Sequence, residues 1–121
     1  MISSAAQQSF QQMVERAIQA SPLVQGAAPR TVELLPDLAR LHSTQAVVLS
    51  VSSYVFRLTF MLHFSDDAAT RQHFAMLARI APQDFSTQAF MDGIRECGNV
   101  CCGNLNRDLV RAFPHIGMST P

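Results

Sequence analysis

Residues 44–64 read TQAVVLSVSSYVFRLTFMLHF, and this stretch decides the fold class of the chain. It is rich in Val, Phe, Leu, Thr and Tyr, which favour pleated strands, and it alternates in part between apolar and polar side chains. Ser52 and Ser53 interrupt it near the middle. We therefore predict two strands, at about 45–51 and 54–63, joined by a tight turn.

An amphipathic helix and a short strand are expected before this hairpin. Residues 4–20 carry apolar side chains at helical spacing, and Ser3 or Ser4 can cap the helix start. Those apolar positions are Phe10, Met13, Val14, Ala17 and Ile18. Residues 31–41 are read as a shorter strand, which Pro36 would confine to the edge of the sheet.

Two helices and a terminal strand are expected after the hairpin. Residues 65–67 read Ser-Asp-Asp and resemble a helix cap, so a helix should run from there to about Arg79. Its buried face is predicted to consist of Phe74, Leu77 and Ala78. The last helix should cover 84–112 and stop before Pro114, and the tail 115–121 could begin a strand. The sum is an α/β domain of the α+β type, an antiparallel sheet covered by helices.

Composition limits the function classes that this chain can serve. At 121 residues it forms one domain, and nine acidic residues balance nine basic ones, which argues against nucleic acid as the main partner. All basic residues are arginine, so Schiff-base chemistry and lysine general bases are excluded. No stretch is apolar enough to span a membrane, and the start does not resemble a signal peptide. Three cysteines confined to positions 97, 101 and 102 favour a reducing, cytoplasmic location.

The last predicted helix has two distinct faces. An apolar stripe should pack on the sheet, and it consists of Phe90, Ile94, Cys97, Cys101 and Leu105. A second face turns away from the core and consists of Asp92, Glu96, Asn99 and Gly103. Gly98 and Gly103 inside a helix cost on the order of 1 kcal/mol each relative to alanine. We expect Gly98 to let the helix approach the sheet closely, and Gly103 to leave space beside Glu96 and Asn99 for a partner.

The run ECGNVCCGNL at 96–105 resembles the E-x-x-N signature helix of the CheC/CheX/FliY group of chemotaxis phosphatases, most of all its CheX-like members. The similarity extends from Asp92 to Pro121, and the upstream order of helix, apolar hairpin and helix fits as well. The resemblance implies that residues 1–121 form a single CheX-like domain. Family members usually continue into further strands, so a second subunit in a homodimer, or a longer protein, would have to complete the sheet.

The resemblance also implies an activity, which is hydrolysis of the aspartyl phosphate on a CheY-type response regulator. In the family the asparagine orients the attacking water and the glutamate engages the regulator's lysine, roles that fall here to Asn99 and Glu96. Asp92, Gly103 and Arg95 would contact the regulator. The phosphatase would need no cofactor of its own, because the Mg²⁺ belongs to the regulator.

Other interpretations of the sequence remain open. The same helix could bind a response regulator or a flagellar-switch-type protein without catalysis, or the domain could sense a small ligand. Cys97 and Cys101 are expected to pack in the core, whereas Cys102 should point elsewhere. His63 and His73 are expected to be surface side chains or to have hydrogen-bond partners, and no cysteine–histidine spacing indicates a metal site.

Overall fold

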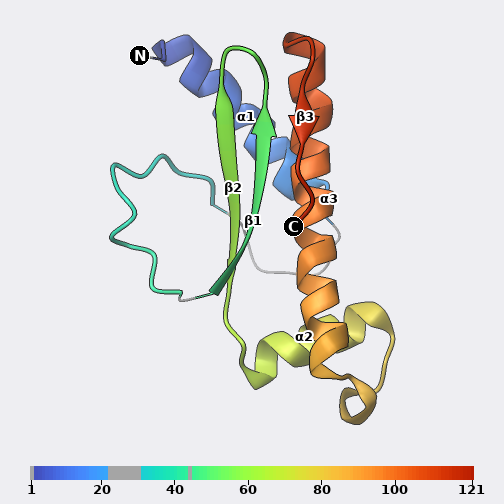
Figure 1. Cartoon of the computed structure of the whole chain (residues 1–121). Coiled ribbons are helices and arrows are strands. Elements are labelled where there is room, and N and C mark those ends of the chain that lie inside the picture. The colour runs from blue at the N-terminus through green and yellow to red at the C-terminus, as the bar shows by residue number, and fades with distance from the viewer. Residues whose placement is uncertain (1, 22–30, 44) are drawn as a thin grey trace.

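The structure, a computed structural model, describes residues 2–21, 31–43 and 45–121. Within these residues the chain is α+β, with three α-helices and a three-stranded antiparallel sheet, which confirms the predicted fold class (Figure 1). The elements in chain order are α1 (Ser4–Gln19), β1 (Gln45–Ser52), β2 (Arg57–Phe64), α2 (Ala68–Ala78), the 3₁₀ turn η2 (Pro82–Asp84), α3 (Thr87–Ala112) and β3 (Gly117–Met118).

The sheet has the strand order β2-β1-β3, and both pairings are antiparallel. The predicted hairpin is confirmed, but its second strand begins at Arg57 because residues 53–56 form the turn. The Ser53 amide donates to the Phe56 carbonyl at 2.9 Å and closes that turn. The strand expected in the tail is also present, and next to it the Ser119 amide donates to the Ser50 carbonyl at 2.9 Å.

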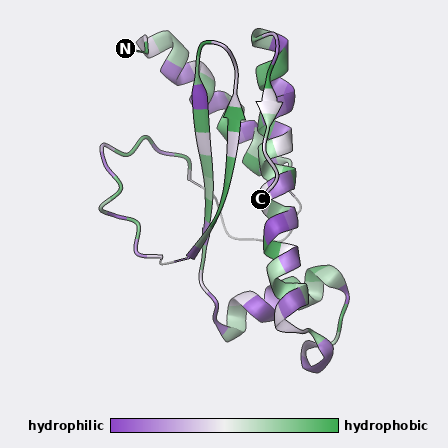
Figure 2. Cartoon of the chain, viewed as in Figure 1, coloured by the Kyte–Doolittle hydropathy of each residue, from purple (hydrophilic) through white to green (hydrophobic). Residues whose placement is uncertain are grey.

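Helices pack on one face of this sheet. α3 packs on β1, and α1 packs on α3 (Figure 1). Val47, Leu49 and Val51 alternate along β1 and are buried, which follows from the two-residue repeat of a strand. The two strands of the hairpin are mainly hydrophobic, whereas α3 shows both hydrophobic and hydrophilic positions along its length (Figure 2).

Two groups of aromatic rings join the elements. Near the hairpin turn, the Phe56 ring centroid lies 4.8 Å from that of Phe113 and 5.8 Å from that of Phe10. At the other end of α3, the Phe90 centroid lies 5.7 Å from that of Phe74 in edge-to-face geometry. Both groups hold α3 firmly at its two ends, since such pairs stabilise beyond their buried area.

The predicted strand at 31–41 is wrong, because residues 31–43 are irregular, with a few bends and one turn and no strand. The Ala39 amide donates to the Asp37 side chain at 2.9 Å, and the Leu41 amide donates to the Leu38 carbonyl at 3.0 Å. These local bonds compete with strand pairing, and Pro36 offers no amide hydrogen.

The predicted buried face of α2 needs correction. Phe74 is buried as expected, but its buried companion is Ala75, whereas Leu77 and Ala78 are exposed. The physical reason is that α2 meets α3 through its middle, where the Phe74 ring lies against Gly93. The cap is Asp67, whose carboxylate accepts the Thr70 amide hydrogen at 2.8 Å.

Candidate functional site

α3 begins three residues later than the sequence predicted and ends where expected. The Ser86 hydroxyl accepts the Ala89 amide hydrogen and caps the start, after the 3₁₀ turn that takes up Pro82–Asp84. At the other end Phe113 adopts extended geometry before Pro114. The helix is thus fixed at both ends, which makes it a rigid support for side chains along its length.

The apolar stripe of α3 packs in the core as predicted. All five of its members are buried, and they are Phe90, Ile94, Cys97, Cys101 and Leu105. Gly98 lies directly on the sheet, since a Cβ at this position would meet Leu49 Cδ1 at 3.2 Å and Val47 Cγ1 at 3.3 Å. The close approach that Gly98 was expected to allow is therefore confirmed.

The opposite side of α3 carries the four predicted polar-face residues together. Asp92 and Glu96 are exposed, while Asn99 and Gly103 are half-buried. Their spacing of four, three and four places them in one row on the helix surface. A Cβ at Gly103 would meet no atom within 4 Å, so open space adjoins Glu96 and Asn99.

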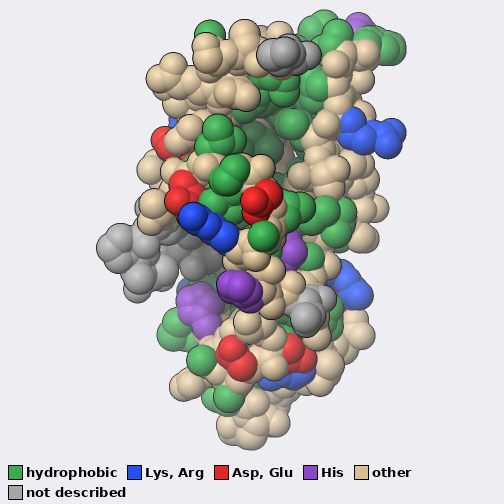
Figure 3. All heavy atoms as spheres, turned by 90° about the vertical axis from the view of Figure 1, so that its left-hand side faces the viewer, with side chains coloured by type: hydrophobic (Ala, Val, Ile, Leu, Met, Phe, Trp, Pro, Cys, Tyr) green, Lys and Arg blue, Asp and Glu red, His purple; other side chains and the backbone are tan. Residues whose placement is uncertain are grey.

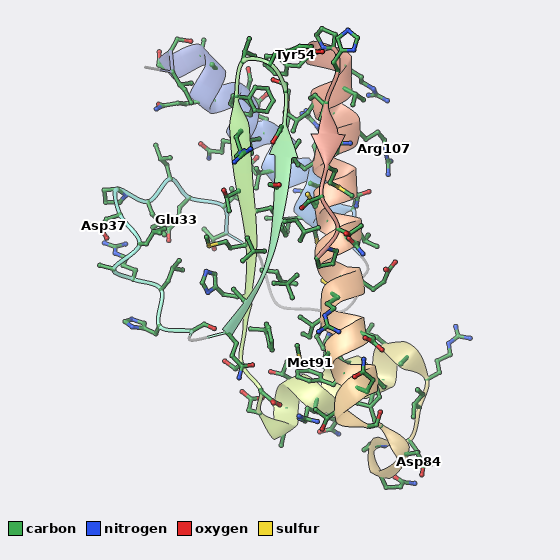
Figure 4. All side chains as sticks on the ribbon, in the orientation of Figure 1. Glu33, Asp37, Tyr54, Asp84, Met91 and Arg107 are labelled. Atoms are coloured by element: carbon green, nitrogen blue, oxygen red, sulfur yellow. The ribbon has the colours of Figure 1, made fainter. Side chains whose placement is uncertain are left out.

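Three arginines lie along α3, and each contacts a polar neighbour on the same helix; Arg111 Nη1 lies 3.9 Å from Asp108 Oδ1. Arg95 Nη1 donates to Asp92 Oδ1 at 3.2 Å, and Gln88 Nε2 donates to the same oxygen at 2.8 Å. Arg107 projects outward from the helix (Figure 4) and donates to Asn104 Oδ1 at 2.7 Å. Sequence reasoning missed Gln88, although its position four residues before Asp92 is the signal that could have found it.

These contacts distinguish the Asp92 carboxylate from the Glu96 carboxylate. The Asp92 carboxylate is paired with Arg95. Glu96 takes part in no ion pair among the residues that the structure describes. Glu96 is therefore the carboxylate on this face that can receive a cation from outside.

The cysteines correct one prediction. Cys97 and Cys101 are buried as expected, but Cys102 is fully buried too, because α3 is covered by β1 and by α1 and its buried face is broad. The Cys101 thiol lies 3.1 Å from the buried Ser21 hydroxyl. A hydrogen bond with Cys101, together with burial, raises the pKa of Cys97, whereas hydrogen bonds to Cys97 and Ser21 lower the pKa of Cys101 to about 6 against the effect of burial.

His63 also departs from expectation. Both of its ring nitrogens are buried without a hydrogen-bond partner in the part of the chain that the structure describes. The alternation of apolar and polar residues along β2 does not predict this burial of His63. The burial of a side chain near a strand end depends on neighbours that are distant in sequence. His73 is half-buried on α2 and stacks edge-to-face on its neighbour Phe74.

Over residues 2–21, 31–43 and 45–121, no group of three or more His, Cys, Asp or Glu could hold a metal ion. No helix in these ranges is long and apolar enough to cross a membrane. No family model, curated protein or solved structure matches the chain. The row of Asp92, Glu96, Asn99 and Gly103 on α3 is therefore the candidate site on its own geometry.

Proposed function

We propose that this chain is a CheX-like phosphatase that hydrolyses the aspartyl phosphate of a CheY-type response regulator, in chemotaxis or two-component signalling. One observation carries the proposal: Glu96 and Asn99 lie one turn apart on the outward side of a rigid helix, with open space at Gly103 beside them. When the two proteins dock, the outward row of α3 would face the regulator's phosphorylation site.

Asn99 would position the attacking water. Its carboxamide oxygen accepts a hydrogen bond from the water, and its NH₂ group donates to a phosphoryl oxygen. Phosphoryl transfer requires little covalent assistance, so placing one water in line with the breaking P–O bond supplies much of the rate. The half-buried state of Asn99 favours this role, because a side chain with restricted rotamers loses less freedom on docking.

Glu96 would pair with the lysine beside the regulator's phosphoryl group. Its carboxylate is exposed, while the neighbouring Asp92 carboxylate is already paired with Arg95. The pairing would orient α3 and set the distance between Asn99 and phosphorus. An ion pair that becomes buried on docking contributes to specificity as well as affinity.

The remaining row residues would complete the contact. Gly103 would let the regulator's backbone approach α3, and the Asp92–Arg95 pair would lie at the edge of the contact. The Mg²⁺ of the reaction would be the regulator's, and the chain would act in the cytoplasm, where response regulators work.

The test combines binding and catalysis in one preparation. A CheY-type regulator carrying aspartyl phosphate is mixed with the chain, and phosphate release and complex formation are both followed. The proposal expects faster release with the wild type, loss of that acceleration with Asn99→Ala, and weaker binding with Glu96→Gln. Met76→Ala, at an exposed position on α2 and away from the outward row of α3, serves as the matched control and should change neither. Binding without faster release would instead identify a non-catalytic regulator-binding module.

A further inference from the structure

The turn between β1 and β2 carries the two most exposed large apolar side chains of the described residues. Tyr54 is 87% exposed and Val55 is 77% exposed, and we call this pair the apolar tip. Turn positions are usually filled by Gly, Pro, Asn, Asp or Ser, so an aromatic and a β-branched residue are unusual there. Viewed from the side, hydrophobic side chains and a histidine lie at the upper end of the molecule (Figure 3). This end therefore offers apolar surface that the core does not use.

The apolar tip is held in place by its neighbours. The Val55 and Phe56 amides both donate to Ser53 Oγ, at 3.2 and 3.3 Å. The Phe56 ring packs inward in the aromatic group near the hairpin turn. The Tyr54 ring lies edge-to-face against His115, with the ring centroids 5.6 Å apart. Because these contacts fix the turn, a partner that binds the tip orders few further side chains, which limits the entropy cost of binding.

Arginines gather at the same end of the molecule. Arg57 follows the turn, and Arg107 and Arg111 lie in the last two turns of α3, which ends beside the hairpin turn (Figure 4). All three are exposed. The nearby Asp108 side chain is only 19% exposed, and Arg16 Nε donates to it at 2.8 Å. The described residues at this end thus carry net positive charge, although the chain as a whole is neutral.

The opposite end of the molecule has the opposite balance. Around α2, at the other end of α3 (Figure 1), three carboxylates outnumber two arginines. The carboxylates are Asp66, Asp67 and Asp84, and the arginines are Arg71 and Arg79. An anionic surface would therefore attract the end with the apolar tip and repel the α2 end, which orients the molecule before contact.

We propose that the apolar tip and the arginines around it dock this chain on an anionic lipid surface. Tyr54 and Val55 enter the interfacial layer, where a ring with one polar end is favoured, and Arg57, Arg107 and Arg111 contact the lipid phosphates. A convex tip fits a deformable lipid surface, whereas an acidic protein would need a pocket of matching shape. The contact is peripheral, and the inference goes beyond the proposed phosphatase function and does not depend on it.

The composition of the chain supplies an internal probe for the experiment. Tyr54 is the one tyrosine and there is no tryptophan, so tyrosine emission reports on the apolar tip alone. The full chain is mixed with vesicles of phosphatidylcholine, or of phosphatidylcholine and phosphatidylglycerol in equal parts. Acrylamide should quench the emission less with the anionic vesicles only, and sedimentation of the vesicles gives the bound fraction. Added salt should lower this fraction, because it screens the arginine contacts.

Variants separate the apolar contribution from the charged one. Arg57→Gln and Arg111→Gln should each lower the partition coefficient by about fivefold, the effect of one cation near an anionic surface. Val55→Ser should lower it by about tenfold, because an apolar side chain is lost from the interfacial layer. Arg79→Gln and Met76→Ser, at exposed positions at the α2 end, are the matched controls and should leave it unchanged.

Circular dichroism checks that each variant is folded. Binding to anionic vesicles that protects Tyr54 from acrylamide, and that Val55→Ser and Arg111→Gln weaken, supports the proposal. A wild type that binds neither kind of vesicle overturns it, as does binding that these two variants weaken no more than Met76→Ser does. Retention on immobilised polyglutamate without binding to anionic vesicles also overturns it, and would assign this end of the molecule to an acidic protein.

Discussion

Gly98 and Gly103 occupy the same helix but meet different surroundings, and this contrast gives a residue-scale prediction. A methyl group at Gly98 would press on the buried Leu49 and Val47 side chains at 3.2 and 3.3 Å, which have little room to move. Gly98→Ala should therefore lower the free energy of unfolding by about 1 kcal/mol net, since overpacking outweighs the gain in helix propensity. Urea unfolding measures the change, and a stabilised Gly98→Ala variant would contradict the close contact.

Gly103→Ala should have the opposite effect on stability. A methyl group there meets no atom within 4 Å, so the helix gains about 1 kcal/mol from propensity alone. The same methyl group would hinder a docking regulator, so we expect slower phosphate release from a more stable protein. Unfolding and phosphate-release measurements on one preparation separate the two effects, and unchanged release would remove Gly103 from the partner contact.

The buried cysteines give a further prediction at the residue scale. Cys97, Cys101 and Cys102 are each at most 5% exposed, and burial raises the pKa of Cys102. Their thiols should react with an aromatic disulfide reagent only as fast as the chain unfolds. Rapid labelling of a thiol in the native protein would contradict their placement in the core.

At the scale of elements, the start of α2 should make stability depend on pH. Hydrogen bonds from Thr70 lower the pKa of the Asp67 cap, and the hydrogen bond from Arg71 lowers the pKa of Asp66. A carboxylate with a lowered pKa stabilises the fold above its unfolded pKa of about 3.9, and the effect is lost as pH falls through the folded value. Asp67→Ala should thus lower Tm at pH 7, with a difference from wild type that closes below about pH 4.

Asp67→Asn is the control for that titration. Asparagine also caps helices, but it carries no charge and does not titrate. The difference in Tm between Asp67→Asn and the wild type should therefore change with pH, because only the wild-type carboxylate titrates. Thermal unfolding followed by circular dichroism across the acid range checks both variants. A constant Tm difference between wild type and Asp67→Ala at all pH values would show that the carboxylate charge is not involved.

The helices and strands also show how much of the fold the sequence could predict. The hairpin and α3 were found because their apolar residues repeat with the periods of a strand and a helix over many positions, and Gly98 was correctly placed against the sheet. The expected strand at 31–41 failed because a strand needs a partner, whereas Asp37 and Leu38 form local turns. The face of α2 was misjudged because its contact with α3 is limited to the middle of the helix.

At the scale of the whole molecule, the candidate site was predictable because it lies on one helix. Glu96, Asn99 and Gly103 share a face through helical spacing alone, so no tertiary information was required. The burial of Cys102 and His63 was not predictable, because it depends on neighbours that only the folded chain brings together.

The most direct test of the central claim is the rate constant for phosphate loss from a phosphorylated CheY-type regulator, with and without this chain. The wild type should increase this rate constant, and Asn99→Ala should return it to the regulator's own value while the circular dichroism spectrum stays unchanged. A folded Asn99→Ala variant that accelerates phosphate loss as fast as the wild type would contradict the account.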